Sequence, residues 1–308
     1  MWNLHLLYLI VLAVSVSAHR SRSNAPAFYS NNKYIMELTS STFHDYVYGS
    51  NYSTIVEFYA PWCGYCKQLK PEFETAAKKA HDYAQFAAVN CDDEKNKQFC
   101  ASQNINAFPT LITYRPPKSF RETVPRDQQY AVQPFENERK ANSIINIMRG
   151  TLKSHVRKVP STKIESYFTR KTGKPRALLL TDKAQVSALY KSLAVDFLSV
   201  MDLNYILVKD DLVDQIRKYA PDLADDVPQL LVIQEDGTVT HYSGKFSKRA
   251  ISEFLSEFAV PVEGDFSDRK RAIDGIKNGK FKSFLQYKKK MAKKEEKQSR
   301  DKLGKDEL

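Results

Sequence analysis

Two cysteines separated by two residues, Cys63 and Cys66, carry the chemistry that this sequence indicates most clearly. They follow the apolar run 55–60 and open a stretch of good helix formers with apolar residues at helical spacing. This pattern predicts that Cys63 lies at a helix N-terminus, where unpaired backbone N–H groups and the helix dipole favour a thiolate. We therefore expect Cys63 to attack a disulfide of another protein, and the less exposed Cys66 to resolve the mixed disulfide.

A zinc site is the competing interpretation of the same cysteine pair. Cys91 and Cys100 could complete a set of four thiolate ligands with Cys63 and Cys66. The strand-to-helix context favours the redox motif, so we expect no metal here.

Both ends of the chain match patterns that are typical of targeting signals. Residues 1–18 are predicted to be a secretory signal peptide, because an apolar stretch from Leu4 to Val16 ends in small residues before His19. An uncleaved anchor is the alternative for this stretch. The last four residues, Lys305-Asp306-Glu307-Leu308, match the retrieval signal of the endoplasmic reticulum. Together the signals predict the lumen of that compartment, where disulfide chemistry is favoured.

The positive charge is concentrated in a C-terminal tail. The chain has 308 residues and a net charge of +11, and its length suggests two domains at roughly 150 residues each. Between Arg269 and Lys305 there are fifteen Lys or Arg against four Asp or Glu, so this stretch accounts for the net charge. We favour a solvated spacer over a surface for nucleic acid or membrane, with a short amphipathic helix around 281–287.

Strands and helices alternate around the cysteines. Strands are predicted at 34–38, 55–60 and 86–90, with a helix at 42–48 and the cysteine helix between the last two strands. This spacing implies a parallel crossover, which puts active residues at the carboxyl ends of the strands.

Three segments of this region have to be considered together as sequence motifs. They are Val56 to Lys67, Val89-Asn90-Cys91-Asp92 and Phe108-Pro109-Thr110-Leu111. Together they resemble the catalytic thioredoxin-like domain of the protein disulfide isomerase family. With a single motif, two apparent domains and the stretch Tyr114 to Lys118, the chain looks like the small fungal members. The resemblance implies a thioredoxin fold and the formation, reduction and rearrangement of disulfides in secretory proteins, without a small-molecule cofactor.

The resemblance also assigns two proton-handling residues. Glu57 matches the family's buried carboxylate, which helps to move the proton of the second cysteine. The family often pairs this acid with a lysine, and the matching position here is Ala88. Arg139 matches a mobile arginine that eases ionisation of the second cysteine. The alternatives are a carboxylate facing solvent and a solvated arginine near a helix start.

Residues around the cysteines are expected to contact substrate. Pro109 matches the family's cis-proline, which leaves a strand edge free to pair with an extended polypeptide. Trp62, Tyr65 and Phe108 complete the predicted contact set. Tyr65 stands where the most familiar isomerase motif has histidine. Because tyrosine supplies no positive charge, we predict a disulfide that is less readily reduced than in the histidine version.

Three further features accompany the first domain. Cys91 and Cys100 are predicted to form a structural disulfide, with free buried thiols as the alternative. Asn51-Tyr52-Ser53 is a candidate glycosylation acceptor in an expected surface loop. The segment Pro116 to Gln129 is far longer than a usual hairpin loop, and we assign it to partner or domain contacts.

A second unit follows near Pro160. It repeats the alternation of strands and helices, and Pro228 precedes an apolar strand as Pro109 does, but the unit has no cysteine. The expected fold class is α/β, with two tandem thioredoxin-like domains of which only the first is catalytic. The expected parts are a signal peptide 1–18, an N-terminal segment 19–33, a catalytic domain 34–158, a non-catalytic domain 159–262 and a basic tail 263–308.

These inferences predict a thiol–disulfide oxidoreductase of the endoplasmic reticulum lumen. Its expected partners are unfolded or misoxidised secretory polypeptides, glutathione or a lumenal thiol oxidase, and a retrieval receptor at the C-terminus, with no nucleic acid and no stable membrane insertion. The alternative is a redox-independent chaperone or escort module, in which the second domain holds unfolded polypeptide.

Overall fold

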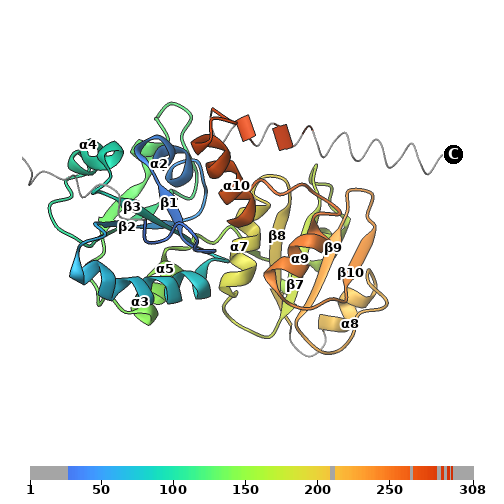
Figure 1. The fold of residues 1–308 in the computed structure, drawn as a ribbon. Coiled ribbons are helices and arrows are strands. Elements are labelled where there is room, and N and C mark those ends of the chain that lie inside the picture. The colour runs from blue at the N-terminus through green and yellow to red at the C-terminus, as the bar shows by residue number, and fades with distance from the viewer. Residues whose placement is uncertain are drawn as a thin grey trace, which may run out of the picture.

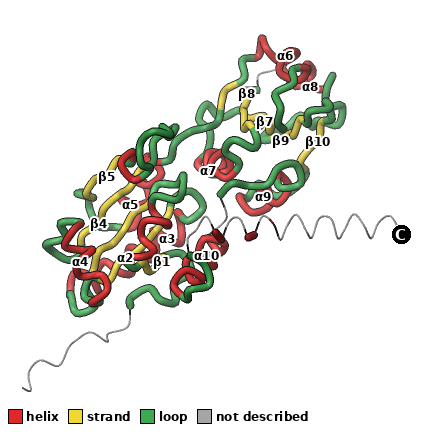
Figure 2. Tube along the Cα trace, turned by 90° about the horizontal axis from the view of Figure 1, so that it is seen from above, coloured by secondary structure: helices red, strands yellow, loops and turns green. Residues whose placement is uncertain are grey.

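The computed structural model describes residues 27–208, 212–263 and 266–282, together with 286, 287, 290, 291 and 293. The predicted signal peptide and retrieval signal lie outside these residues. The described chain forms two five-stranded sheets, each covered by helices on both faces (Figure 1). Seen from above, the two units lie end to end (Figure 2). This arrangement agrees with the tandem α/β fold class that the sequence predicts.

The first sheet places the strand before the cysteines at its centre. Its order is β1-β3-β2-β4-β5, with β1, β3 and β2 parallel and the last two strands antiparallel. The strands are β1 (Met36–Leu38), β2 (Thr54–Tyr59), β3 (Gln85–Asn90), β4 (Thr110–Arg115) and β5 (Ala131–Pro134).

Four helices cover the first sheet: α2 (Ser40–Val47), α3 (Gly64–Ala80), α4 (Glu94–Ser102) and α5 (Ala141–Thr151). All six residues of β2 are buried, which explains its nearly continuous apolar character. Because side chains alternate along a strand, Ile55 and Tyr59 lie in the core under α3 and α5. Val56 and Phe58 lie in the opposite core, which we call the α2-face core.

The second sheet has the same topology. Its order is β10-β9-β7-β8-β6, and its strands are β6 (Arg157–Lys158), β7 (Arg176–Thr181), β8 (Asp202–Leu207), β9 (Gln229–Ile233) and β10 (Val239–Tyr242). Its helices are α6 (Ile164–Thr169), α7 (Ala188–Asp196), α8 (Leu212–Arg217) and α9 (Lys248–Leu255). Short 3₁₀ turns occupy η1 (Asp127–Gln129) and η2 (Ser161–Lys163). Because β6 pairs with β8, Arg157 and Lys158 belong to the second unit, not to the first as the sequence predicted.

The beginning of the tail is not a solvated spacer. The helix α10 (Phe266–Lys277) returns to the first unit and lies next to α2 (Figure 1). Ala272 and Ile273 are buried in the α2-face core. Gly279, with φ of +70°, follows the end of the helix, and Phe281 packs so closely over Gly275 that a Cβ there would lie 2.4 Å from its ring. The helix predicted around 281–287 falls partly outside the described residues, since 283–285 are not among them, and α10 itself has no counterpart in the sequence-based prediction.

The segment before β1 also belongs to the first unit. The sequence predicts that residues 19–33 lie outside the catalytic domain, but Tyr29 is 1% exposed and lies in the core under α3. None of the helices in the described ranges is both long and apolar enough to cross a membrane.

Candidate active site

The cysteine pair lies at the start of α3, directly after the central strand. β2 ends at Tyr59, and a turn closed by a hydrogen bond from Cys63 N to Ala60 O leads into the helix. Cys63 is the N-cap residue of α3, and its Sγ accepts a hydrogen bond of 3.4 Å from the backbone N–H of Cys66. Both residues are free thiols in this structure, with Cys63 7% exposed and Cys66 fully buried. The strand, turn and helix therefore place the two sulfur atoms in the predicted order.

The loop before β4 lies against the first cysteine. The peptide bond between Phe108 and Pro109 is cis, and Pro109 is buried. Cys63 Sγ lies 3.5 Å from the carbonyl oxygen of Phe108 and donates to it. The structure thus brings together the two segments that the sequence analysis joined only by resemblance.

Two exposed aromatic side chains flank this contact. Trp62 is 55% exposed and Tyr65 is 73% exposed, although large apolar side chains are usually covered. Trp62 Nε1 donates a hydrogen bond of 3.1 Å to Asp92, and its ring meets the ring of Phe108 edge-on at 6.1 Å. These contacts fix an apolar rim beside Cys63 that a polypeptide could cover.

Glu57 is buried beneath the cysteine helix. It lies on the same face of β2 as Ile55 and Tyr59, is 0% exposed, and has Ala88 and Leu111 beside it on the neighbouring strands. Burial raises the pKa of Glu57 to about 8. Ala88 therefore occupies the position directly beside the acid and offers it no charge or hydrogen bond.

Several neighbours adjust the pKa of this carboxyl. The hydroxyl of Tyr29 donates a hydrogen bond of 2.5 Å to Glu57 Oε2 and lowers the pKa. The negative charge of Glu37 raises it, whereas the positive charges of Arg139 and Lys70 lower it. A carboxyl with this balance changes its protonation state close to neutral pH, as a proton acceptor must.

The second cysteine requires such an acceptor. Burial is the main reason why the pKa of Cys66 is raised to about 12, and the contact with Cys63 and the negative charge of Glu57 act in the same direction. At neutral pH the thiol is therefore almost entirely protonated and cannot attack a disulfide unaided. The negative charge of Glu57 is one of the influences on the pKa of Cys66, so the carboxylate lies near the thiol whose proton must be removed.

Arg139 lies in the loop between β5 and α5, and its side chain is exposed. Its charge acts on Glu57, so it lies on the same side of the molecule as the site. Its assigned role in easing the ionisation of Cys66 remains a prediction.

Cys91 and Cys100 form a disulfide that joins the end of β3 to α4, with their Cα atoms 5.9 Å apart. In this state neither sulfur is a thiolate that could ligate zinc with the first pair. Within the described ranges, no three His, Cys, Asp or Glu side chains are grouped so that they could hold a metal ion.

The candidate glycosylation site does not lie in a freely exposed loop. Tyr52 and Ser53 are buried, and the backbone N–H of Asn51 donates to Glu263, which follows the second domain. The Oδ1 atom of Asn51 accepts a hydrogen bond of 2.7 Å from Arg126. Because the Tyr52 hydroxyl donates to Asp196 of α7, the expected surface loop is part of the contact between the two units.

The long insertion holds the same loop from within the first unit. Arg126 also donates to the carbonyl oxygens of Tyr48 and Ser50, and its guanidinium lies 3.7 Å from the ring centre of Phe120. The segment therefore braces the loop between α2 and β2 within the first unit, and its assignment to partner or domain contacts stays a prediction.

Tyr29 is the site residue that the sequence analysis missed. It precedes the first predicted strand in a segment rich in small and polar residues, so no periodic pattern marks it as buried. The short run Phe28-Tyr29 was the available signal.

Comparisons with known proteins agree with this geometry. The thioredoxin family matches residues 34–136. Protein disulfide-isomerase MPD1 of Saccharomyces cerevisiae is 32% identical over 281 residues, which cover 83% of this chain and 88% of that protein. Protein disulfide-isomerase 2-3 of Arabidopsis thaliana is 38% identical over 109 residues, covering 35% of this chain and 22% of that protein. A crystal structure of ERdj5 superposes with a TM-score of 0.52 at 17% identity, covering 75% of this chain and 30% of that one, and supports the fold alone.

Proposed function

This chain belongs to the protein disulfide isomerase family as a thiol–disulfide oxidoreductase, and from that premise we propose that it forms, reduces and rearranges disulfide bonds in secretory proteins folding in the endoplasmic reticulum. The observation that carries the proposal is the position of Cys63. Its sulfur caps α3 beside the Phe108 carbonyl, between two exposed aromatic side chains. The predicted signal peptide and retrieval signal support the compartment.

The reaction begins at the outer sulfur. The thiolate of Cys63 attacks one sulfur of a substrate disulfide, the substrate S–S bond breaks, and the other substrate sulfur leaves as a thiolate. A mixed disulfide between Cys63 and the substrate remains. The helix N-terminus favours the negative charge at Cys63 before attack.

The inner sulfur then completes the exchange. Glu57 accepts the proton of the Cys66 thiol, and the resulting thiolate attacks Cys63 Sγ. A Cys63–Cys66 bond forms as the substrate sulfur leaves, so the substrate is reduced and the protein oxidised. The reverse sequence donates a disulfide, and attack by another substrate thiol on the mixed disulfide gives rearrangement.

The surroundings of Cys63 suit an extended polypeptide. We assign Phe108 and Pro109 to the backbone of the substrate, next to the sulfur, and Trp62 and Tyr65 to its apolar side chains. After the Cys63–Cys66 disulfide has been donated to a substrate, glutathione in its disulfide form or a lumenal thiol oxidase would re-oxidise the two thiols. A retrieval receptor would recognise the last four residues.

The proposal is tested by measuring how fast a test protein with scrambled disulfides regains its own activity. The wild type should restore native disulfides, whereas Cys63→Ser should show no turnover. Cys66→Ser should accumulate a mixed disulfide at Cys63, which mass spectrometry of acid-quenched samples detects. The matched control is the double change Cys91→Ser and Cys100→Ser, which removes two sulfurs away from the site. Full turnover by Cys63→Ser would sink the assignment.

Polypeptide holding without redox chemistry is the second candidate. The second unit has no cysteine and exposes Phe246, which is 42% accessible. Suppression of aggregation of a denatured test protein should then survive replacement of both Cys63 and Cys66 by serine. Loss of suppression in that variant would restrict the chain to its redox role.

A further inference from the structure

We propose that Tyr29 is a positioning residue for Glu57, which makes the segment 27–32 part of the oxidoreductase site. The inference rests on the proposed function, since it concerns the step in which Cys66 loses its proton.

The first support is the contact itself. The Tyr29 hydroxyl donates a 2.5 Å hydrogen bond to Glu57 Oε2, and the two residues are 1% and 0% exposed. The other carboxyl oxygen, Oε1, is buried and has no hydrogen-bond partner among the described residues. One oxygen of Glu57 is therefore held, and the other remains able to accept a proton.

The second support is that the neighbouring strands provide no substitute. Ala88 and Leu111 stand directly beside Glu57 in the sheet, and neither side chain can donate a hydrogen bond. A buried carboxylate without a donor is strongly destabilised. Tyr29 supplies the missing donor from outside the sheet.

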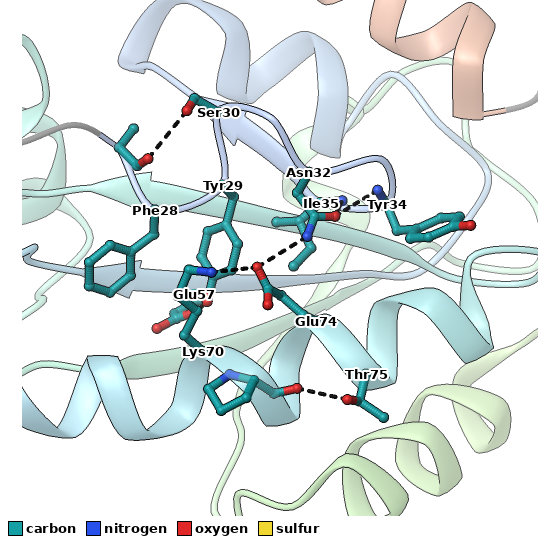
Figure 3. A network of polar contacts seen from close by, with 12 residues as sticks. Phe28, Tyr29, Ser30, Asn32, Tyr34, Ile35, Glu57, Lys70, Glu74 and Thr75 are labelled. Atoms are coloured by element: carbon teal, nitrogen blue, oxygen red, sulfur yellow. Dashed lines mark hydrogen bonds and ion pairs between the residues drawn. The ribbon is translucent and has the colours of Figure 1, made fainter.

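The third support is the way in which Tyr29 is anchored. Its backbone N–H donates to Glu37 Oε1 at 2.9 Å, and the same oxygen accepts a hydrogen bond of 2.7 Å from the Tyr59 hydroxyl. The Tyr29 ring packs against Tyr59 and Phe73 with centroid distances of 5.9 and 6.0 Å. Figure 3 shows Tyr29 descending from the N-terminal segment to Glu57. These contacts hold the hydroxyl in one place.

The preceding residue fixes the segment from the other side. The Phe28 ring stacks on Tyr59 at 4.6 Å, and its backbone N–H donates to the Tyr59 hydroxyl at 2.8 Å. Phe28, Tyr29 and Tyr59 therefore form one aromatic group that joins the N-terminal segment to β2.

The charged groups around Glu57 come from three other elements. Glu37 on β1 opposes its ionisation, whereas Lys70 on α3 and Arg139 before α5 favour it. Lys70 is paired with Glu74 at 2.6 Å, so part of its charge is neutralised. The Tyr29 hydrogen bond is the largest influence that lowers the pKa of Glu57, which raises the carboxylate fraction at neutral pH.

In the resolving step, Tyr29 keeps its own proton. Burial and the nearby carboxylates raise the pKa of Tyr29 far above its usual range, so the phenol donates a hydrogen bond without ionising. The Cys66 proton moves to Glu57 Oε1, the Cys66 sulfur bonds to Cys63, and the substrate sulfur departs with the bonding electrons. The proton then passes from Glu57 to the departing thiolate or to solvent.

A single-turnover experiment with the full chain tests this role. Reduced protein is mixed with glutathione disulfide and quenched in acid, and mass spectrometry follows conversion of the Cys63–glutathione mixed disulfide into the Cys63–Cys66 disulfide. Loss of a hydrogen bond to a carboxylate raises the pKa of that carboxyl group by roughly one pH unit or more. Tyr29→Phe should therefore slow this conversion about tenfold at pH 7, and the defect should shrink as the pH rises above the pKa of Glu57.

Tyr114→Phe is the matched control. Tyr114 is also fully buried, on the opposite face of the sheet, and its hydroxyl has no hydrogen-bond partner among the described residues. This change should leave both the rate and its pH dependence as in the wild type. A thermal unfolding curve for each variant verifies that the fold is retained.

Glu57→Gln separates positioning from packing. If Tyr29 acts through Glu57, adding Tyr29→Phe to Glu57→Gln should not slow resolution further. A second, multiplicative loss, or a Tyr29→Phe defect that is equal at every pH, would overturn the inference. If the wild type itself does not convert the mixed disulfide, the proposed function fails instead.

Discussion

The hydroxyl of Tyr52, just before β2, donates a hydrogen bond of 2.7 Å to Asp196 Oδ1, at the end of α7 in the second unit. The Nζ atom of Lys248, on α9, lies 2.9 Å from Asp196 Oδ2 and 2.9 Å from the Tyr52 oxygen. Tyr52 and Asp196 are buried. A carboxylate, an ammonium and a phenol therefore join the two units in a site largely shielded from water.

Removing the cation of this group should weaken the whole chain. Lys248→Met leaves the Asp196 carboxylate buried without its ion-pair partner, and we expect a loss of about 3 kcal/mol in the free energy of unfolding. Urea denaturation measures it. Arg249→Met is the control, because Arg249 pairs with Glu253 at a position where the two side chains are 90% and 64% exposed, and such pairs contribute about 0.5 kcal/mol. Equal effects of the two changes would contradict the proposed importance of the buried group.

Glu57 should destabilise the fold increasingly as the pH rises. Its pKa is about 8 in the folded protein against an ordinary value of 4.5, so the folded state holds a proton that the unfolded chain has released between those limits. Stability therefore falls from pH 4.5 to pH 8. Glu57→Gln should be more stable than the wild type by roughly 3 to 5 kcal/mol at pH 8.5, with the difference vanishing near pH 4.5.

Urea unfolding at several pH values measures this difference. Glu136→Gln, at an exposed position of the same unit, controls for the loss of a carboxylate as such. A Glu57→Gln advantage that does not depend on pH would show that ionisation of the buried acid is not its cause.

Tyr65 should set the direction of the redox reaction. The side chain is 73% exposed and carries no charge, so a histidine cation at this position would favour the reduced thiolate form. Tyr65→His should raise the reduction potential of the Cys63–Cys66 couple by roughly 30 mV. Equilibration in glutathione buffers, followed by alkylation, measures it. Tyr65→Phe should leave the potential nearly unchanged, and a more reducing Tyr65→His protein would refute the charge argument.

The Cys91–Cys100 disulfide should contribute stability without taking part in turnover. Replacing both residues by alanine removes a short cross-link from the unfolded chain and should cost about 2.5 to 3 kcal/mol through loop-closure entropy. Denaturation of the double variant measures this cost, while turnover of a disulfide substrate at low temperature should persist. Loss of turnover by a fully folded variant would instead give this pair a redox role.

Local sequence pattern was sufficient for much of the first unit. The buried run of β2 and the helical spacing after Cys66 predicted the strand, the turn and the capping position of Cys63, and each is present. These are properties of adjacent residues. For the same reason, Pro109 and Glu57 could be placed in the site only through resemblance, because their contacts come from segments distant in the sequence.

Long-range packing explains what the sequence did not reveal. Tyr29 is a single buried residue in a polar segment. Its place in the site depends on its hydrogen bond to the carboxyl of Glu57, which lies 28 positions away in the chain. In α10, charged residues surround a narrow apolar stripe that includes Ala272 and Ile273, so the stretch resembles a solvated tail. The buried contact of Asn51-Tyr52-Ser53 likewise requires a second unit that no local pattern foretells.

The return of α10 to the first unit ties that unit's completion to the order of synthesis. Ala272 and Ile273 follow the entire second unit in the chain, yet they fill the α2-face core of the first. A ribosome-bound chain that has already exposed all four cysteines still lacks this part of its apolar interior. The first unit, which carries the reactive thiols, is therefore the first to be translated and the last to complete its apolar core.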